Sequence, residues 1–312
     1  MTNNAPLIFH HKNVSPYSEK IRLMLGYAEC HWQSVLVPLT PPRLSLDTLI
    51  DGYRRIPVAQ IGADVFCDTR IISAEIALLT DKPQLNPFAQ SEQHWRRAEY
   101  IESDIFQVAL NSLNVLGLVR AMLSQIPLNQ LVNYLSDKKF LYENSHPDLI
   151  ANARSRAESK ALWQQYLDEL EASLTNDFLT GKEPQYVDFC AVHLIWFRMG
   201  MEGSVLFKRR AKLKSWYQKM TNFNHGKSID ISAIDAISEA KNAQPRVLAP
   251  DMLQSARIGK RVSVATTDVL VGETHGCLVG ENDERWIIAK QNQATGLVHI
   301  HFPKTTYLLT EL

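Results

Sequence analysis

The sequence predicts a multidomain protein with three structural classes along one chain: an α/β domain over residues 1–82, an all-helical domain over 88–240 and a small antiparallel β domain over 257–312. Three observations support this division. Strand-like runs alternate with helical periodicity in the first segment, longer helical periodicity fills the second, and glycine-separated runs rich in Val and Ile fill the third. A chain of 312 residues, 45% of them hydrophobic, also exceeds one ordinary domain.

The first segment begins with a predicted βαβ unit. Leu7–Phe9 form a short apolar run, and Val35–Val37 form a second one. Between them, Ile21, Leu25 and Ala28 recur at near-helical spacing, which predicts a helix.

A hairpin and a further helix complete this segment. After a short apolar-periodic stretch at Leu44–Ile50, the runs Pro57–Ile61 and Val65–Cys67 flank a turn at Gly62–Asp64. A closing helix is predicted over Ile71–Leu79. The resulting order, β-α-β-(α)-β-β-α, is the thioredoxin-like pattern.

The second segment follows a turn-rich linker at Pro83–Pro87 and reads as helical throughout. Two long helices are predicted from their apolar positions, which are Trp95, Ala98, Ile101, Ile105, Val108 and Leu113 in the first and Trp163, Tyr166, Leu167, Leu170 and Leu174 in the second. A second linker is predicted at Asn242–Gln254.

The third segment is predicted to form an SH3-like small β-barrel or meander. Its strand-like runs are Val262 with Val264, Trp286–Ala289 and Leu297–Phe302. We interpret four glycines as separators between these strands: Gly272, Gly276, Gly280 and Gly296.

The composition excludes several classes of protein. Lys plus Arg and Asp plus Glu both number 33, so no net charge attracts nucleic acid or an anionic membrane. The start Met1–Pro6 lacks a signal-peptide pattern, and no apolar window approaches the length of a membrane span. The four cysteines show neither C-x-x-C spacing nor a metal-ligand grouping. We therefore expect a cytoplasmic protein with free thiols and no metal site.

Three short motifs in the first segment point to a ligand site. Ser15-Pro16-Tyr17-Ser18 stands at a predicted helix start, Ile56-Pro57 enters a predicted strand, and Asp68-Thr69 precedes a predicted helix. A proline at a strand start cannot join the ladder, and X-Pro is the bond whose cis form costs least. A cis turn there leaves the backbone groups of Ile56 free to pair with a peptide-like ligand.

With these motifs, residues 5–235 resemble the glutathione S-transferase superfamily, which joins a thioredoxin-like domain to a helical domain. The resemblance implies that Ser15 occupies the catalytic position and that Ile56-Pro57 binds the cysteinyl part of glutathione. It also implies that Asp68-Thr69 holds the γ-glutamyl end and that the protein pairs into a homodimer. Tyr17 is a further candidate for contact with the bound ligands, and Arg55 for the glycyl carboxylate.

The chemistry requires a stabilised thiolate. A thiol with a pKa of about 8.5 is mostly protonated at neutral pH, although the thiolate is the nucleophile. A hydrogen bond donated by the Ser15 hydroxyl to the sulfur, together with the positive end of a helix, favours the thiolate over the thiol. Two alternatives stay open: Ser15 is simply an N-cap with Pro16 at the first helical position, or Ser18 is the donor. Likewise, Asp68-Thr69 is interpreted both as the N-cap of the helix from Ile71, with Thr69 as the cap, and as a ligand contact, and the two interpretations can hold together.

Several features stand outside the resemblance. The segment Gln185–Asp188 keeps only the acid of the family's Ser/Thr-x-x-Asp capping box, and the β tail lies beyond the standard architecture.

His299 and His301 share one strand face, and we interpret them as solvated or half-buried histidines rather than as metal ligands. The basic run Lys208–Lys214 is interpreted as a solvated helix face rather than a nucleic-acid patch.

The sequence thus predicts a glutathione S-transferase-like enzyme that activates the thiol of glutathione, its co-substrate, for attack on a small hydrophobic electrophile. The electrophile is expected between the two domains, near Tyr17 and Phe106. Two alternatives remain: a non-catalytic adaptor that binds a protein through its helical or β-tail surface, and a glutathione-dependent isomerase or peroxidase.

Overall fold

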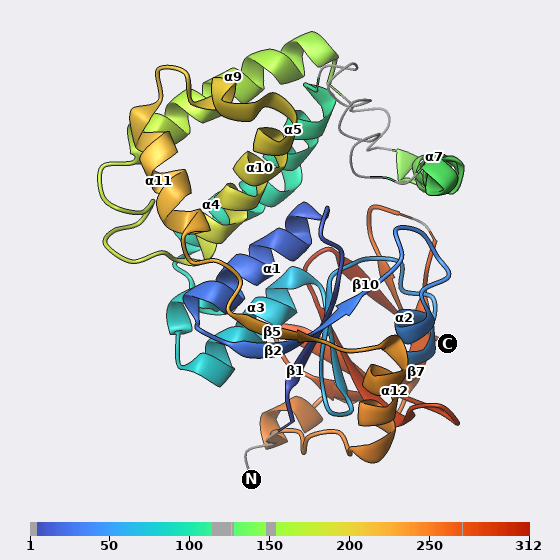
Figure 1. The fold of residues 1–312 in the computed structure, drawn as a ribbon. Helices are drawn as coiled ribbons and strands as arrows, with labels where there is room; N and C mark the ends of the chain where they lie inside the picture. The colour runs from blue at the N-terminus through green and yellow to red at the C-terminus, as the bar shows by residue number, and fades with distance from the viewer. Residues whose placement is uncertain (1–4, 114–125, 127, 148–153, 270) are drawn as a thin grey trace.

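The computed structural model describes residues 5–113, 126, 128–147, 154–269 and 271–312. Its centre is one mixed β-sheet, with helices on both faces and a helical bundle beside it (Figure 1). Within the described residues, no helix has the length and apolarity needed to cross a bilayer.

The thioredoxin-like half has the predicted element order. Its elements are β1 (Leu7–His11), α1 (Pro16–Tyr27), β2 (His31–Leu36), α2 (Leu44–Leu49), β3 (Val58–Ile61), β4 (Asp64–Cys67) and α3 (Thr69–Thr80). Strand β1 runs parallel to β2 and antiparallel to β3, and β3 pairs with β4 as a hairpin. The βαβ unit and the hairpin are therefore confirmed.

The helical domain follows two 3₁₀ turns, η1 (Pro83–Leu85) and η2 (Pro87–Ala89). Its described elements are α4 (Glu92–Tyr100), η3 (Ile101–Ile105), α5 (Phe106–Asn111), α7 (Leu128–Glu143), α9 (Arg156–Ser173), α10 (Tyr186–Glu202), η4 (Gly203–Phe207) and α11 (Ala211–Thr221). The first predicted long helix is interrupted by η3, a π-helical turn, and such turns are frequent at functional sites. Helix α7 lies apart from α9, α10 and α11 (Figure 1).

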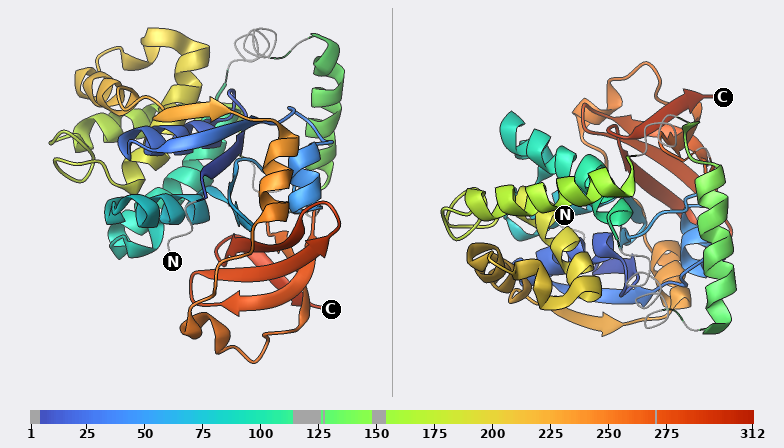
Figure 2. Two further views of the ribbon diagram at one scale, coloured as in Figure 1. Left: turned by 60° about the horizontal axis from the view of Figure 1, so that its bottom comes forward. Right: turned by 90° about the horizontal axis from the view of Figure 1, so that it is seen from above.

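The expectation of an all-helical segment up to residue 240 is wrong at one place. Residues Lys227–Asp230 form strand β5, which adds to the sheet parallel to β2. All four side chains are exposed and lack apolar alternation, so the strand depends on backbone pairing that the sequence does not signal. The following helix, α12 (Ala233–Asn242), lies beside α2 on one side of the sheet (Figure 2).

The last segment contains η5 (Pro250–Leu253), β6 (Arg261–Thr266), β7 (Thr274–Glu281), β8 (Arg285–Asn292), β9 (Gly296–Pro303) and β10 (Tyr307–Glu311). Strands β6 to β9 form an antiparallel meander, and β10 returns to pair with β6, which is the strand order of the predicted SH3-like class. The interpretation of Gly276 and Gly280 as separators is wrong: both lie inside β7, and Gly280 lies where the pairing register shifts.

The β domain is joined edge to edge with the thioredoxin-like sheet. Strand β9 pairs parallel with β4, so Asp64 lies beside His299 and Phe66 beside His301. The result is a continuous ten-stranded sheet with the order β10-β6-β7-β8-β9-β4-β3-β1-β2-β5 (Figures 1 and 2). One hydrophobic core includes Ile300 and Phe302 from the tail together with Val65 and Cys67 from β4. The two regions therefore share a core.

A buried polar network strengthens this junction. His301 Nε2 lies 3.0 Å from Asp64 Oδ1, and the backbone N–H of Arg246 donates to Asp64 Oδ2 (2.9 Å). Glu75 of α3 pairs with Arg246 (3.0 Å) and Arg285 (2.6 Å). His299 is half-buried, as expected, whereas His301 is buried because Asp64 partners its ring. Among the described residues, no group of three potential ligands is placed to hold a metal ion.

Candidate functional site

The strand register brings the three predicted motifs to one edge of the sheet. His10, near the end of β1, lies beside Val58 at the start of β3, and Val58 lies beside Cys67 at the end of β4. The loop that leads to Ser15, the Ile56-Pro57 turn and the Asp68-Thr69 helix start therefore all emerge at this edge, which we call the motif edge. The motifs converge because β3 runs antiparallel to both β1 and β4, so that the ends of β1 and β4 lie at the same edge as the start of β3.

Ser15 is the N-cap of α1, with Pro16 in the first turn, so the capping interpretation is confirmed. Its Oγ accepts a hydrogen bond from the Ser18 N–H (3.2 Å). This bond uses a lone pair of the oxygen and leaves the hydroxyl hydrogen available to a ligand. Ser15 is half-buried, whereas Ser18 is fully buried, and Ser18 Oγ accepts from the Lys12 N–H (3.4 Å). Exposure therefore favours Ser15 over Ser18 as the ligand-facing hydroxyl.

The Ile56–Pro57 peptide bond is cis. Within the described part of the chain, no hydrogen bond occupies the N–H or C=O of Ile56, although the adjoining strand is fully paired. A buried or half-buried backbone group without a partner costs free energy, so this turn is suited to pairing with the backbone of a ligand.

Asp68, and not Thr69, caps α3. The helix begins at Thr69, and Asp68 Oδ1 accepts from the Arg70 N–H (2.9 Å). The sequence interpretation of Thr69 as the cap is therefore wrong. Asp68 adopts a φ of 72°, a left-handed conformation that Asp tolerates better than a β-branched residue does. Thr69 Oγ1 instead accepts a hydrogen bond from Lys20 Nζ (3.3 Å).

A buried ionic cluster lies behind Thr69, and we call it the Lys20 cluster: Lys20, Thr69, Glu102 and Tyr186. Lys20 Nζ contacts Glu102 Oε1 (2.5 Å) and the Tyr186 hydroxyl (2.8 Å), and that hydroxyl donates to Glu102 Oε2 (3.2 Å). Burial would raise the pKa of Glu102, but Lys20 and Arg70 lower that pKa to about 2. Because Glu102 belongs to the π-helical turn η3, the cluster ties the helical domain to the motif edge.

Tyr17 joins the two domains at this place. Its hydroxyl donates to the backbone carbonyl of Glu102 (3.4 Å), and its ring centroid lies 4.9 Å from Phe106 and 5.1 Å from His193. The predicted neighbours Tyr17 and Phe106 therefore do meet between the domains. Their rings are tilted by 48° against each other, and neither residue lines the cavity nearest to the Ser15 loop.

An apolar cavity of about 300 Å³ adjoins the Ser15 loop. It is lined by Val14, Trp196, Phe197, Met199, Gly200, Met201 and Tyr217. Sequence reasoning missed the α10 residues because α10 is apolar on nearly every face, which hides the positions that line a hollow. The paired methionines Met199 and Met201 are the one signal available, since flexible thioether side chains adapt to varied apolar ligands.

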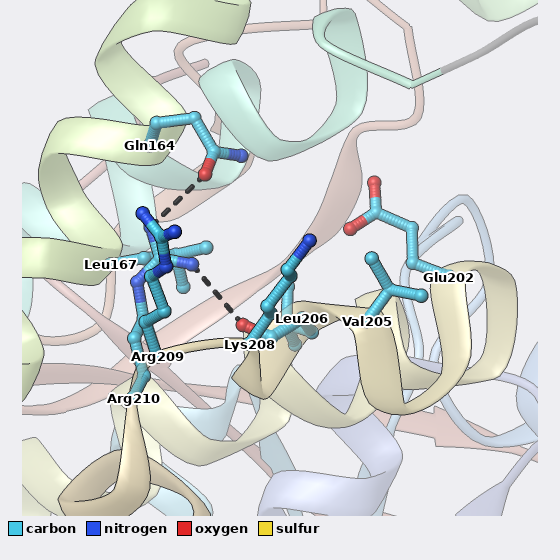
Figure 3. A pocket seen from close by; sticks show the side chains of 8 residues that line it. All are labelled: Gln164, Leu167, Glu202, Val205, Leu206, Lys208, Arg209 and Arg210. Carbon is cyan, nitrogen blue, oxygen red and sulfur yellow. Dashed lines mark hydrogen bonds between the residues drawn. The ribbon is translucent and has the colours of Figure 1, made fainter.

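A second cavity, of about 390 Å³, lies elsewhere in the helical domain (Figure 3). Part of the basic run lines it, but Arg210 is engaged by Asp168 (2.8 Å) and Gln164 (3.0 Å), while Lys208 and Arg209 are exposed. None of the predicted site residues contributes to this cavity. Lys208 and Arg209 are therefore solvated, as expected, but the expected helix face is wrong for Lys208–Arg210, which precede α11, and Leu213 is buried.

Arg55 has a partner from the β tail. Its guanidinium pairs with Asp268 and lies 5.9 Å from the centre of the Tyr307 ring. The neighbouring Arg54 pairs with Asp137 of α7 (2.5 Å). The role of Arg55 toward a glycyl carboxylate stays a prediction, and any such ligand competes with the Asp268 carboxylate.

The stability of the protein is expected to fall on acidification. Burial lowers the pKa of His10 and of His193 to about 4, below the ordinary value of 6.5. Between pH 6.5 and 4 only the unfolded state takes up these protons, so the stability is full above this window and is lost as pH falls. Each histidine should reduce the free energy of unfolding by about 2 kcal/mol between pH 7 and 5. Urea unfolding at several pH values measures this slope, and an unchanged slope in His193→Gln would contradict it.

Comparisons with known proteins agree with this geometry. Residues 9–83 match the family model of the glutathione S-transferase N-terminal domain. A GST-like protein from Pseudomonas syringae has 26% sequence identity and a TM-score of 0.79, with 99% of this chain and 100% of that chain covered. FzlA from C. crescentus has 22% identity and a TM-score of 0.45, with 69% and 88% covered.

A theta class glutathione S-transferase from Xanthomonas axonopodis pv. citri, solved with glutathione bound, has 16% identity and a TM-score of 0.45, with 70% of this chain and 93% of that chain covered. The sequence has no significant match among curated proteins. The alignment with the Pseudomonas protein extends through the β tail, so that tail is part of a shared architecture. The chain thus contains a glutathione S-transferase N-terminal domain, and over nearly its whole length it has the fold of a GST-like protein, in which a C-terminal β domain is added to the thioredoxin-like and helical domains.

Proposed function

We propose that this protein is a glutathione transferase in which Ser15 activates the thiol of glutathione for attack on a small hydrophobic electrophile. The observation that carries the proposal is the motif edge. A half-buried serine hydroxyl with a free hydrogen, an unpaired backbone turn at Ile56-Pro57 and the N-terminus of α3 emerge there together.

The electrostatics support thiolate formation at Ser15. The hydroxyl stands at the N-terminus of α1, where orphan N–H groups and the helix dipole favour negative charge. Lowering a thiol pKa by two units requires about 2.7 kcal/mol. One charge-assisted hydrogen bond and one helix end are together of this size.

The cavity beside Val14 supports an apolar second substrate. Its lining is almost entirely hydrophobic, and Val14 directly precedes Ser15 in the chain. The residue next to Ser15 therefore lines a space that favours a small, weakly polar electrophile. A thiol–disulfide mechanism needs a protein thiolate, and position 15 is serine, so a transferase is favoured over a glutathione-dependent peroxidase. The homodimer and the cytoplasmic location stay predictions.

Replacing Ser15 by alanine tests the assignment. The variant should lose one charge-assisted hydrogen bond, which corresponds to a fall in the conjugation rate of about ten- to a hundredfold. The pKa of bound glutathione should rise, so the pH–rate profile should move to higher pH. Conjugation with an aryl halide, titrated against pH, gives both quantities, and calorimetry should show glutathione binding largely retained.

Ser18→Ala is the matched control, because Ser18 is fully buried and its Oγ accepts a hydrogen bond from the Lys12 N–H. Equal loss of rate in both variants would assign the effect to the helix start as a whole. Unchanged rate in Ser15→Ala, with active wild type, would remove Ser15 from the mechanism.

A further inference from the structure

The added β domain reaches the motif edge through its topology. Because β9 runs parallel to β4, the end of β9 lies at the same edge as the end of β4. The turn from β9 to β10 therefore emerges close to Asp68. Two residues from this turn contact the thioredoxin-like domain: Tyr307, which begins β10, and Thr306, whose Oγ1 lies 3.3 Å from Arg70 Nη1.

Tyr307 connects directly to the cap of α3. Its hydroxyl donates to Asp68 Oδ2 at 3.5 Å and lies 3.0 Å from the hydroxyl of Tyr53. The other carboxylate oxygen of Asp68 caps the helix through the Arg70 N–H. Both tyrosines are 5% exposed, so the hydroxyl pair is shielded from water. A buried hydrogen bond to a carboxylate orients that group, and such bonds shorten when a ligand binds.

We infer that Tyr307, supplied by the C-terminal β domain, is a positioning residue for the thiol substrate. It acts through Asp68 and fixes the carboxylate that meets the α-ammonium group of the γ-glutamyl moiety. This inference rests on the proposed function. It assigns the added domain a role in selecting thiols that carry a free ammonium group at that end, in addition to its part in the shared core.

The hydroxyl of Tyr53 provides a matched control. Tyr53 and Tyr307 are equally buried, and both rings lie against Phe302, with centroids at 5.9 and 5.7 Å. Tyr53 contacts Tyr307 but not Asp68 through its hydroxyl. Removal of either hydroxyl thus perturbs the core similarly, whereas only Tyr307→Phe removes a hydroxyl from Asp68 Oδ2 and leaves that oxygen to Arg70 Nη1, which lies 3.5 Å away.

The experiment measures the dissociation constants of glutathione and of N-acetylglutathione, which lacks the ammonium charge, for full-length wild type, Tyr307→Phe and Tyr53→Phe. Tyr307→Phe should weaken glutathione binding about tenfold and N-acetylglutathione binding much less, so the preference for glutathione shrinks. Tyr53→Phe should stay within about twofold of wild type. Turnover at saturating glutathione should persist in Tyr307→Phe, since Ser15 is untouched. In an Asp68→Asn background, Tyr307→Phe should have no further effect on the preference.

Three results overturn the inference. Equal effects of the two tyrosine variants, or equal weakening of glutathione and N-acetylglutathione binding in Tyr307→Phe, would mean that Tyr307 has only a structural role. Glutathione binding by wild type would still support the proposed transferase in that case. An undiminished effect of Tyr307→Phe in the Asp68→Asn background would show that it does not act through Asp68. Absence of glutathione binding by wild type would overturn both the inference and the proposed function.

Discussion

Replacing Lys20 by methionine should lower the free energy of unfolding by about 3–5 kcal/mol, because it removes the nearest cation from the buried Glu102 carboxylate. Lys20 is completely buried, and three polar partners surround its ammonium group. The carboxylate remaining in the variant retains the Tyr186 hydroxyl and the Arg70 guanidinium at 3.8 Å, neither of which replaces the direct contact with Lys20 at 2.5 Å. Urea unfolding monitored by tryptophan fluorescence measures the loss.

An exposed ion pair in the same protein is the control. Lys219 and Asp177 form a pair whose side chains are 43% and 58% exposed, so Lys219→Met should cost less than about 1 kcal/mol. The double variant Lys20→Met with Glu102→Leu should recover much of the stability, since it removes both buried charges. A cost for Lys20→Met no larger than that for Lys219→Met would mean that the Lys20 cluster is not a buried ionic site.

Phe302→Ala should destabilise the thioredoxin-like domain as well as the β tail, at a cost of about 3–5 kcal/mol. Phe302 is fully buried on β9, and its core includes residues of β1, β3 and β4. A cavity there removes contacts on both sides of the β4–β9 junction. Hydrogen exchange of backbone amides should therefore accelerate in β3 and β4 together with β6 to β9.

Leu308→Ala is the comparison for this variant. Leu308 lies on β10 and is 60% exposed, so its truncation should change stability by no more than about 0.5 kcal/mol. Acceleration confined to the tail strands in Phe302→Ala would show that the two regions unfold independently and would contradict the shared core.

Local sequence patterns predicted most of the thioredoxin-like half. The elements from β1 to α3 follow periodicities that span a few residues each, and turn residues such as Gly62 mark their ends. Strand β5 had no such pattern, because an exposed edge strand needs only backbone pairing. The junction of β9 with β4 was also unpredictable, since apolar alternation shows that a strand is buried on one face but does not name its neighbour.

In the candidate site too, local patterns were predictable from the sequence and long-range contacts were not. Ser15, Ile56-Pro57 and Asp68-Thr69 were found because capping and proline chemistry are local. The sequence did not show that Asp68 caps α3 while Thr69 accepts a hydrogen bond from Lys20. The cap depends on a left-handed φ at Asp68, and the Thr69 contact depends on a lysine from a different helix. Tyr307 and Asp268 lie more than two hundred positions from the residues that they contact, so no spacing in the sequence indicated them.

The β4–β9 junction joins two strands that leave the ribosome at different times during synthesis. The outer edge of β4 is synthesised early, whereas its partner in β9 follows more than two hundred residues later, as the pairing of Asp64 with His299 shows. Until then the nascent thioredoxin-like domain presents an open strand edge, and such edges pair readily with other chains. Pairing of β4 with β9 is therefore a long-range event, and protection by a chaperone is most valuable in the interval before β9 appears.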